Sequence, residues 1–227
     1  MKTSFKWIAA ITAASAGLLV TGSAVAQTAG SVMVRLGATQ IRPNVDSGDL
    51  TAPAFAGTKA DIRSNTQLSG GFTYMLTDNI SVDIPLALPY KHDIVGAGAI
   101  AGVGKIGEVK ALPFTVLGQF RFLEPESALR PYLGLGLTYA KFYKARSTAV
   151  LSGLTGGTPA NPTTISIKSK FAFTPQVGAS WRINELWFID VSWSRTFLKT
   201  RTSLSTGQTL DATVNPDALG LTVGYKF

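Results

Sequence analysis

Residues 219–227 read Leu-Gly-Leu-Thr-Val-Gly-Tyr-Lys-Phe and alternate between two kinds of side chain up to the last residue. Successive side chains of a strand point to opposite faces, so one face carries Leu221, Val223, Tyr225 and Phe227. The other face carries glycine, Thr222 and Lys226. Chain ends of soluble domains are usually frayed rather than apolar. The stretch is therefore typical of the closing strand of a membrane β-barrel, with its apolar face toward lipid.

The opposite end of the chain has the features of a secretory signal peptide over residues 1–26. Lys2 and Lys6 form a positive region, residues 8–20 form an apolar core, and Ala24-Val25-Ala26 is a small-residue cleavage site. The apolar core is too short to cross a bilayer as a helix. We expect residues 1–26 to be removed after export and residues 27–227 to form the mature protein.

Composition limits the function classes that this chain can serve. Only 15% of its 227 residues are charged, and its mean hydropathy of +0.21 is high for an exported soluble domain. It has no cysteine and one histidine, which excludes disulfides and zinc sites of the usual His/Cys kind. The full chain has a net charge of +8, and loss of Lys2 and Lys6 with the signal peptide leaves +6. We expect no cofactor, no metal and, for an exported membrane chain, no nucleic-acid partner.

Eight segments alternate in hydropathy and are each about long enough to cross a membrane as a tilted strand. These predicted strands are residues 32–41, 66–76, 80–90, 109–122, 131–143, 169–182, 187–200 and 218–227. A soluble secreted sandwich would need a second apolar surface to cover these faces. The pattern instead predicts an all-β fold, an eight-stranded antiparallel transmembrane barrel of the outer membrane, over residues 27–227.

The connections between these segments alternate in length. Residues 77–79, 123–130 and 183–186 form short connections, whereas residues 42–65, 91–108, 144–168 and 201–217 form long ones rich in Gly, Ser, Thr or Pro. Outer-membrane barrels have short periplasmic turns and long outer loops, with aromatic girdles at both interfaces. The expected periplasmic girdle is Tyr74, Phe120, Phe122, Trp181, Trp187, Tyr225 and Phe227, and the expected outer girdle is Tyr90, Tyr139 and Tyr143.

Several stretches in order along the mature chain resemble the outer membrane protein W (OmpW) family of small Gram-negative barrels, which includes AlkL-like proteins. They are residues 77–83 (Thr-Asp-Asn-Ile-Ser-Val-Asp), 89–94 (Pro-Tyr-Lys-His-Asp-Ile), 109–113 (Val-Lys-Ala-Leu-Pro), 130–136 (Arg-Pro-Tyr-Leu-Gly-Leu-Gly), 182–184 (Arg-Ile-Asn) and 223–227. The resemblance implies an eight-stranded barrel whose narrow apolar pocket passes small hydrophobic molecules. It also implies that the assembly machinery recognises the terminal Phe227. Two stretches depart from the family, Ser169-Lys170-Phe171 and residues 155–159, and both lie at the predicted outer rim.

Alternation also predicts which side chains face the lumen of so narrow a barrel. Toward the outer mouth these are apolar and form a predicted ligand vestibule: Ala87, Pro89, Ala111, Pro113, Ala140, Phe142 and Leu198. Toward the periplasm they are polar or charged and form a predicted plug: Arg35, Asp83, Gln119, Arg121, Gln176, Arg182, Asp190 and Lys226. Enclosed charges need partners, so we expect Arg35, Arg121 and Lys226 to pair with the two aspartates.

Two functions are compatible with this interior. In the first, the barrel passes small hydrophobic molecules from the outer vestibule and releases them sideways between strands into the bilayer, because the plug blocks the way down. In the second, the apolar residues only fill the barrel, and the protein is a structural, adhesion or stress-response surface barrel. Catalysis is not expected, because no recognised nucleophile motif accompanies the lone His92 beside Asp93.

A third group of residues is basic and lies at the outer ends of the predicted strands 131–143, 169–182 and 187–200. It consists of Lys141, Lys144, Arg146, Lys168, Lys170, Lys199 and Arg201. Such residues keep an outer rim solvated, and they also bind phosphate groups well. We expect them to contact the phosphates of lipopolysaccharide in the outer membrane.

Overall fold

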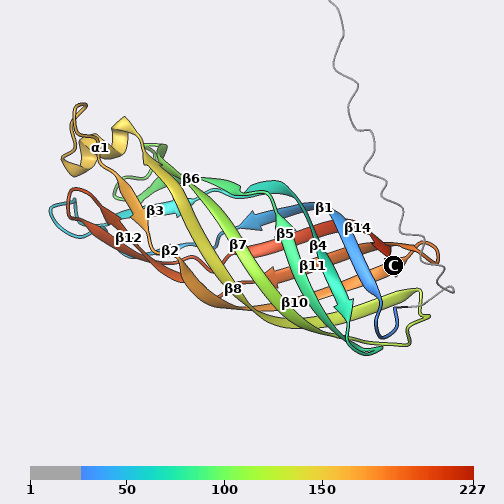
Figure 1. Cartoon of the computed structure of the whole chain (residues 1–227). Coiled ribbons are helices and arrows are strands. Elements are labelled where there is room, and N and C mark those ends of the chain that lie inside the picture. Colours follow the sequence, from blue (N-terminus) through green and yellow to red (C-terminus); the bar gives the residue numbers. More distant parts are fainter. Residues whose placement is uncertain (1–26) are drawn as a thin grey trace, which may run out of the picture.

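The computed structural model describes residues 27–227 and shows a long, closed antiparallel β-barrel with a strand-rich extension at one end (Figure 1). The predicted signal peptide lies outside the described residues. Strand β7 pairs with both β5 and β8, which closes the sheet and confirms the predicted eight-stranded fold. The barrel strands are β1 (Val32–Arg42), β4 (Asn65–Met75), β5 (Ile80–Ala87), β7 (Lys105–Arg121), β8 (Leu129–Ser147), β10 (Lys170–Arg182), β11 (Trp187–Arg195) and β14 (Asp217–Lys226).

The C-terminal strand β14 closes the barrel between the N-terminal strand β1 and the hairpin strand β11. Lys226 lies opposite Met33 in β1, and Tyr225 lies opposite Trp187 in β11. Its two faces differ as the sequence predicts, since Leu221 is 60% exposed on the outside while Lys226 is 6% exposed on the inside. The strand therefore joins an apolar outer surface to a polar lumen.

The outer wall of the barrel carries exposed aliphatic and aromatic side chains from all eight strands. At the periplasmic end the aromatic rings pack on one another, with Trp187 5.0 Å from Tyr225 and Phe120 5.1 Å from Phe122 between ring centroids. Tyr139 packs against Phe171 near the outer end. The prediction of Tyr90 in the outer girdle is wrong, because its ring is 1% exposed and faces the lumen.

The long outer connections fold into structure, whereas the sequence predicts loops. They contain β2 (Asp46–Ser47), β3 (Thr58–Ile62), β6 (Tyr90–Gly98), α1 (Ala149–Thr155), β9 (Ile165–Ile167), β12 (Lys199–Leu204) and β13 (Thr209–Thr213). Strands β2, β13, β12 and β9 form a second sheet, and β3 and β6 extend the barrel wall (Figure 1). Two predicted strands are also split, because residues 80–90 divide between β5 and β6, and residues 187–200 divide between β11 and β12.

An apolar core holds this outer extension together. Its buried side chains come from segments far apart in the sequence, among them Leu50, Ile94, Ile106, Leu151 and Leu204. These residues lie in the segments predicted as loops, so the alternation of the predicted strands does not identify them. Within the described part of the chain, no helix is long and apolar enough to cross a membrane.

Candidate functional site

The lumen of the outer half of the barrel contains a cavity of about 150 Å³, which we call the barrel cavity. Six of the seven residues predicted for the vestibule line it: Ala87, Ala111, Pro113, Ala140, Phe142 and Leu198. The seventh, Pro89, is absent from this lining. Leu198, with Ala140, Ala172 and Val214, forms a small buried apolar cluster in this wall. The lining of the barrel cavity is thus mainly apolar, as the sequence predicts for the outer part of the lumen.

A second apolar cavity, of about 90 Å³, lies on the outer side of the barrel cavity, inside the outer extension. We call it the upper cavity. Both cavities share Ile62, Val109, Phe142 and Val214 in their linings. Phe142 also packs on both apolar clusters of the outer half. These four side chains form the partition between the two cavities, an arrangement that strand alternation alone does not predict.

The barrel wall is incompletely paired between β5 and β7. The ladder between these strands stops at Asp83 and resumes only at Tyr90, in β6. Residues 84–89 and 112–116, which we call the β5–β7 seam, thus have no ladder pair with each other in the described structure. Three residues of the seam are prolines, which lack the amide donor that a ladder needs: Pro85, Pro89 and Pro113. Pro89 therefore belongs to the seam in the wall.

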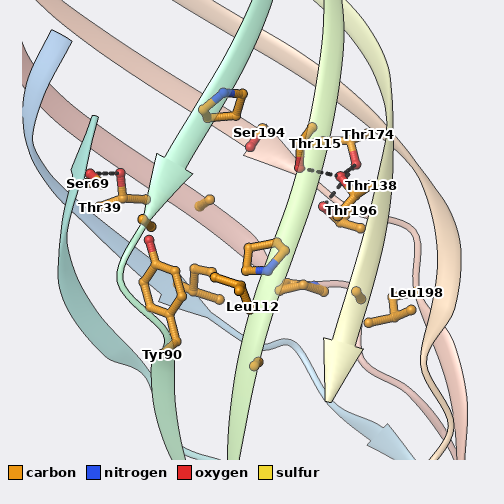
Figure 2. Close-up of a pocket in the computed structure, with 18 of the residues that line it drawn as sticks. Thr39, Ser69, Tyr90, Leu112, Thr115, Thr138, Thr174, Ser194, Thr196 and Leu198 are labelled. Carbon is orange, nitrogen blue, oxygen red and sulfur yellow. Dashed lines mark hydrogen bonds between the residues drawn. The ribbon is translucent and has the colours of Figure 1, made fainter. Parts of the chain in front are cut away.

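The barrel cavity reaches this seam. Pro85, Leu86, Leu112 and Pro113 all line it, although Leu86 is 49% exposed on the outer surface of the barrel. Figure 2 shows Leu112 and Tyr90 beside the cavity on neighbouring strands. An unpaired, proline-containing stretch of wall is thus the boundary between the apolar cavity and the region that lipid occupies.

Hydroxyl groups form a belt around the periplasmic part of the cavity, toward the top of Figure 2. A chain of hydroxyls links Thr115 to Thr138 at 2.8 Å, Thr138 to Thr174 at 2.7 Å, and Thr174 to Thr196 at 3.0 Å. On β1 and β4, the hydroxyls of Thr39 and Ser69 lie 2.7 Å apart. This belt is not among the features predicted from the sequence, although alternation places Thr115 on the same face as Pro113, two residues further along the strand.

On the periplasmic side of the hydroxyl belt, the lumen is filled by a buried ion-pair network centred on Arg35. Its guanidinium group lies 2.5 Å from Asp83 Oδ1 through Nη2 and 2.9 Å from Asp190 Oδ1 through Nη1. The hydroxyls of Thr73 and Tyr132 donate to Asp83 and Asp190 at 2.6 and 3.0 Å. Ionised groups this deep in a protein are stable only when paired and hydrogen-bonded. The three predicted plug residues Arg35, Asp83 and Asp190 are therefore brought together.

Arg121 joins this network through neutral partners. Its guanidinium group donates to Ser180 Oγ at 2.9 Å and to Gln119 Oε1 at 2.9 Å, and it lies 4.7 Å from the centroid of the Tyr132 ring. Ser180 in turn donates to Asp190 Oδ2 at 2.9 Å. The expected direct pairing of Arg121 with an aspartate is absent from the ion pairs of residues 27–227, because Ser180 occupies the intervening position.

Two other predictions for the plug fail. Lys226 is buried but takes part in none of the ion pairs of residues 27–227, since it lies at the periplasmic rim near Glu185 and Arg182. Arg182 is exposed at the end of β10 rather than enclosed. Arg130 does close the floor instead, because its guanidinium group donates to the carbonyl oxygens of Gln27 at 2.9 Å and Asp78 at 2.6 Å. Lys226 and Arg182 thus lie at the periplasmic end of the barrel, outside the ion-pair network.

The seven predicted lipopolysaccharide-contact residues are all exposed on the outer part of the molecule. Lys168, Lys170, Lys199 and Arg201 line one open polar groove with Lys59, and we call this the basic groove. Asp46 and Asp211 also line it, and Asp211 binds Arg201 through two hydrogen bonds of 2.7 and 2.6 Å. Lys141, Lys144 and Arg146 do not line this groove.

The lone histidine is part of the barrel cavity. His92 is 4% exposed, and its Nδ1 atom lies 2.8 Å from the carbonyl oxygen of Arg63. Its ring is stacked on that of Tyr90, with 6.2 Å between the centroids. In the described residues no group of three or more His, Cys, Asp or Glu side chains is placed to hold a metal ion.

Comparison with known proteins identifies the family. The model of the OmpW family matches residues 28–227, nearly all of the described chain. The chain belongs to the OmpW family. It is 32% identical over 202 residues to outer membrane protein W of Vibrio cholerae, a match that covers 87% of this chain and 89% of the relative. Members of this family are outer-membrane barrels of Gram-negative bacteria, and this chain is one of them.

Two further comparisons bear on shape and context. The crystal structure of the outer membrane protein OprG from Pseudomonas aeruginosa superposes with a TM-score of 0.78 at 27% identity, and covers 89% of this chain and 99% of OprG. The dibenzothiophene metabolism operon protein PahQ of Pseudomonas aeruginosa is 27% identical over 176 residues, which is 75% of this chain and 76% of PahQ. The fold of this chain is therefore similar to that of OprG over 89% of its length.

Proposed function

We propose that this OmpW-family barrel passes small hydrophobic molecules from the outside into the barrel cavity and releases them through the β5–β7 seam into the bilayer. The observation that supports this best is the position of Leu86 and Pro113 in the seam and in the cavity lining at once. An apolar solute leaving there moves between two apolar environments. Its path needs only a small separation of two strand segments that are already unpaired.

The lower half of the barrel argues against exit toward the periplasm. Arg35, Asp83 and Asp190 are each at most 7% exposed and fill the lumen with paired charge. To pass, an apolar molecule would have to separate these ions, and an unpaired buried charge is very unfavourable. The sideways route avoids that cost.

The family context is consistent with a hydrophobic solute. PahQ is named for an operon of dibenzothiophene metabolism, and dibenzothiophene is an apolar aromatic compound. A cavity with a few polar groups in an otherwise apolar lining is the usual form of a small-molecule site. Phe142 controls entry in this scheme, because it lies in the partition between the upper cavity and the barrel cavity.

Substitution of Phe142 by Asp tests the proposal. The carboxylate should abolish the barrel-dependent uptake of n-octane by intact cells, because an apolar solute cannot displace the water bound to an ionised group. The control variant is Phe142→Leu, which keeps the partition apolar and should retain most of the uptake. Folding of both variants is checked by the heat-dependent shift of the barrel on gels. Unchanged uptake in a folded Phe142→Asp variant would favour a structural or adhesion barrel instead.

Two contacts with the envelope complete the proposal. We propose that the basic groove, together with Lys141, Lys144 and Arg146, binds lipopolysaccharide phosphates, since both Lys and Arg are suited to phosphate. Replacing Lys168, Lys170 and Lys199 by Gln should then weaken salt-sensitive binding to lipopolysaccharide vesicles.

We also propose that the barrel assembly machinery binds the β14 strand through Phe227, which is 71% exposed. Deletion of Phe227 should lower the yield of folded barrel in cells, and an unchanged yield would contradict this role.

A further inference from the structure

Gln176 lies where the apolar and charged halves of the lumen meet. It is an inward-facing residue of β10, is 8% exposed, and belongs to the lining of the barrel cavity. Thr174, two residues earlier on the same face, is part of the hydroxyl belt. Gln176 is thus the first polar side chain of the lower half that a molecule in the cavity can reach.

The orientation of the Gln176 amide follows from its neighbours. Arg121 has only donors, so its 2.9 Å contact must be with the oxygen of the Gln119 side chain. Ser81 accepts from Arg121 Nε and donates to the same oxygen at 3.1 Å. Gln119 therefore presents its nitrogen to Gln176, at 2.8 Å from Gln176 Oε1. The side-chain nitrogen of Gln176 is therefore the last atom of this chain of hydrogen bonds, and its two N–H groups are available as donors.

The free donors of Gln176 are not satisfied by the protein. In the hydrogen-bond network of residues 27–227, its side chain is engaged only through Oε1. The nitrogen is also not occluded, because the sealed polar atoms without a partner in that part of the chain are Arg35 Nε, Thr58 Oγ1, Asp83 Oδ2 and Thr222 Oγ1. A ligand that fills the cavity excludes water from this nitrogen, and a donor left without a partner is then costly, so a ligand group at the base of the cavity that accepts its hydrogen bond gains affinity.

The charges of the plug decide what kind of acceptor this is. The network next to the cavity contains two guanidinium groups, Arg35 and Arg121, and two carboxylates, Asp83 and Asp190, so its formal charge is zero. Two further buried cations, Arg130 and Lys226, lie beyond it at the periplasmic floor and rim. No cation of this network remains to balance a carboxylate brought into the apolar cavity, and an unpaired buried anion is strongly disfavoured. A neutral oxygen has no such penalty, and the nearby hydroxyl belt can both donate and accept.

We propose that Gln176 is a specificity-determining residue, which selects apolar molecules that carry one neutral hydrogen-bond-accepting oxygen, such as medium-chain ketones, esters and alcohols. The hydrocarbon part fills the apolar cavity, and the oxygen binds the Gln176 amide at its base. This inference rests on the proposed uptake function and specifies its substrate class. Plain hydrocarbons enter the same cavity without this hydrogen bond.

The test compares 2-octanone with n-octane, two probes of equal chain length. Cells that express the full protein or its Gln176→Met variant are exposed to each probe, washed, extracted and analysed by gas chromatography. Because one neutral hydrogen bond contributes about 1 kcal/mol, barrel-dependent uptake of 2-octanone at low concentration should fall by roughly five- to tenfold in the variant. Uptake of n-octane should change less than about twofold, since no hydrogen bond to it is lost.

Thr222→Val is the matched control. Thr222 is a buried inward-facing residue of β14 that does not line the barrel cavity, and its hydroxyl has no partner in residues 27–227. Its replacement removes one lumenal hydroxyl without changing shape, so uptake of both probes should stay the same. A heat-modifiability gel establishes that each variant is folded, because Gln176→Met leaves Gln119 Nε2 without its partner.

A spectroscopic measurement separates ligand binding from a structural role. The carbonyl stretching band of 2-octanone bound to the purified barrel should lie at lower frequency in the wild type than in Gln176→Met, because the band moves when the oxygen accepts a hydrogen bond. An equal loss of both probes in a folded variant, or an unchanged band, would overturn the inference but leave the uptake function standing. If wild-type cells accumulate neither probe faster than cells lacking the protein, the proposed function fails and the inference fails with it.

Discussion

The outer and periplasmic halves of this barrel are built from the same strands but have opposite interiors. In the outer half, apolar side chains leave the barrel cavity, and the wall has a gap at the β5–β7 seam. In the periplasmic half, Arg35, Asp83, Asp190 and Arg121 fill the lumen with charge, and the wall is fully laddered from Ile80 to Asp83. In this barrel, the half whose lumen is filled thus also has the paired β5–β7 wall, and the half with the cavity has the unpaired one.

The two interiors are stable for different physical reasons. The charged half gains from specific contacts, because each ion is held by an opposite charge and by hydroxyls such as those of Thr73 and Tyr132. The apolar half is stabilised by the burial of apolar surface, which requires no particular direction of contact and tolerates an unfilled space. A ligand can therefore occupy the outer half without breaking any bond of the protein.

The largest expected effect comes from breaking the charged half. Arg35→Met leaves Asp83 and Asp190 buried without their counterion, so the free energy of unfolding should fall by about 3–5 kcal/mol. Urea unfolding of the barrel in lipid vesicles measures this change. The control is Arg195→Met at the partly exposed Arg195–Asp217 pair, where the loss should be much smaller. Equal losses at the two sites would show that the network does not depend on its burial.

Closing the wall of the apolar half should have the next largest effect. Pro113→Val supplies an amide donor in the seam at similar side-chain volume, so β7 can pair with β5 there. If solutes leave through the seam, uptake of n-octane should drop several-fold while binding to the purified barrel is retained. Pro131→Val is the control, because Pro131 lies in a paired part of the periplasmic wall, opposite Ala179 of β10 and accepting a hydrogen bond from Phe122, and should not change uptake. Unchanged uptake in folded Pro113→Val would exclude exit at this place.

The smallest effect is expected at an exposed ion pair, which extends the comparison beyond the lumen. The Arg201 guanidinium group beside Asp211 lowers the pKa of that carboxyl below its usual value of 3.8. The pair therefore stabilises the folded state above that pKa, and this contribution is lost as the pH falls through the lower folded pKa. Arg201→Met should raise the NMR titration midpoint of Asp211 toward 3.8, with little change in stability at pH 7 because the pair is exposed. A midpoint that does not move would contradict the assignment.

The two-residue alternation of the sequence predicts the barrel strands well, because each side chain faces either lipid or lumen according to its own position in the strand. Alternation sorts Leu221 from Thr222 and Leu135 from Gly136 with a period of two, and lipid and lumen impose that period on every strand. The same period identifies most of the cavity lining. Tyr90 and Pro89 break the rule, because the strand ends at Ala87 and restarts at Tyr90, so the faces are exchanged between β5 and β6.

The outer extension and the partners inside the lumen were beyond such reasoning. Leu50 and Leu204 belong to one core although they are far apart in sequence, and no periodicity connects them. Alternation predicts that the side chains of Arg121 and Lys226 face inward, but it does not predict their position along the barrel axis or their direction within the lumen. Ser180 therefore separates Arg121 from Asp190, and Lys226 lies at the rim.

The sequence by itself determined that this chain is an outer-membrane barrel with an apolar outer lumen and a polar inner one, because side-chain polarity must match lipid or lumen residue by residue. Tertiary structure alone decided the rest. Strand register sets which inward residues meet, so it made the Arg35 network, left the β5–β7 seam unpaired and turned the Gln176 amide toward the cavity. Register and stagger arise from contacts between distant segments, and such contacts leave no periodic trace in the sequence.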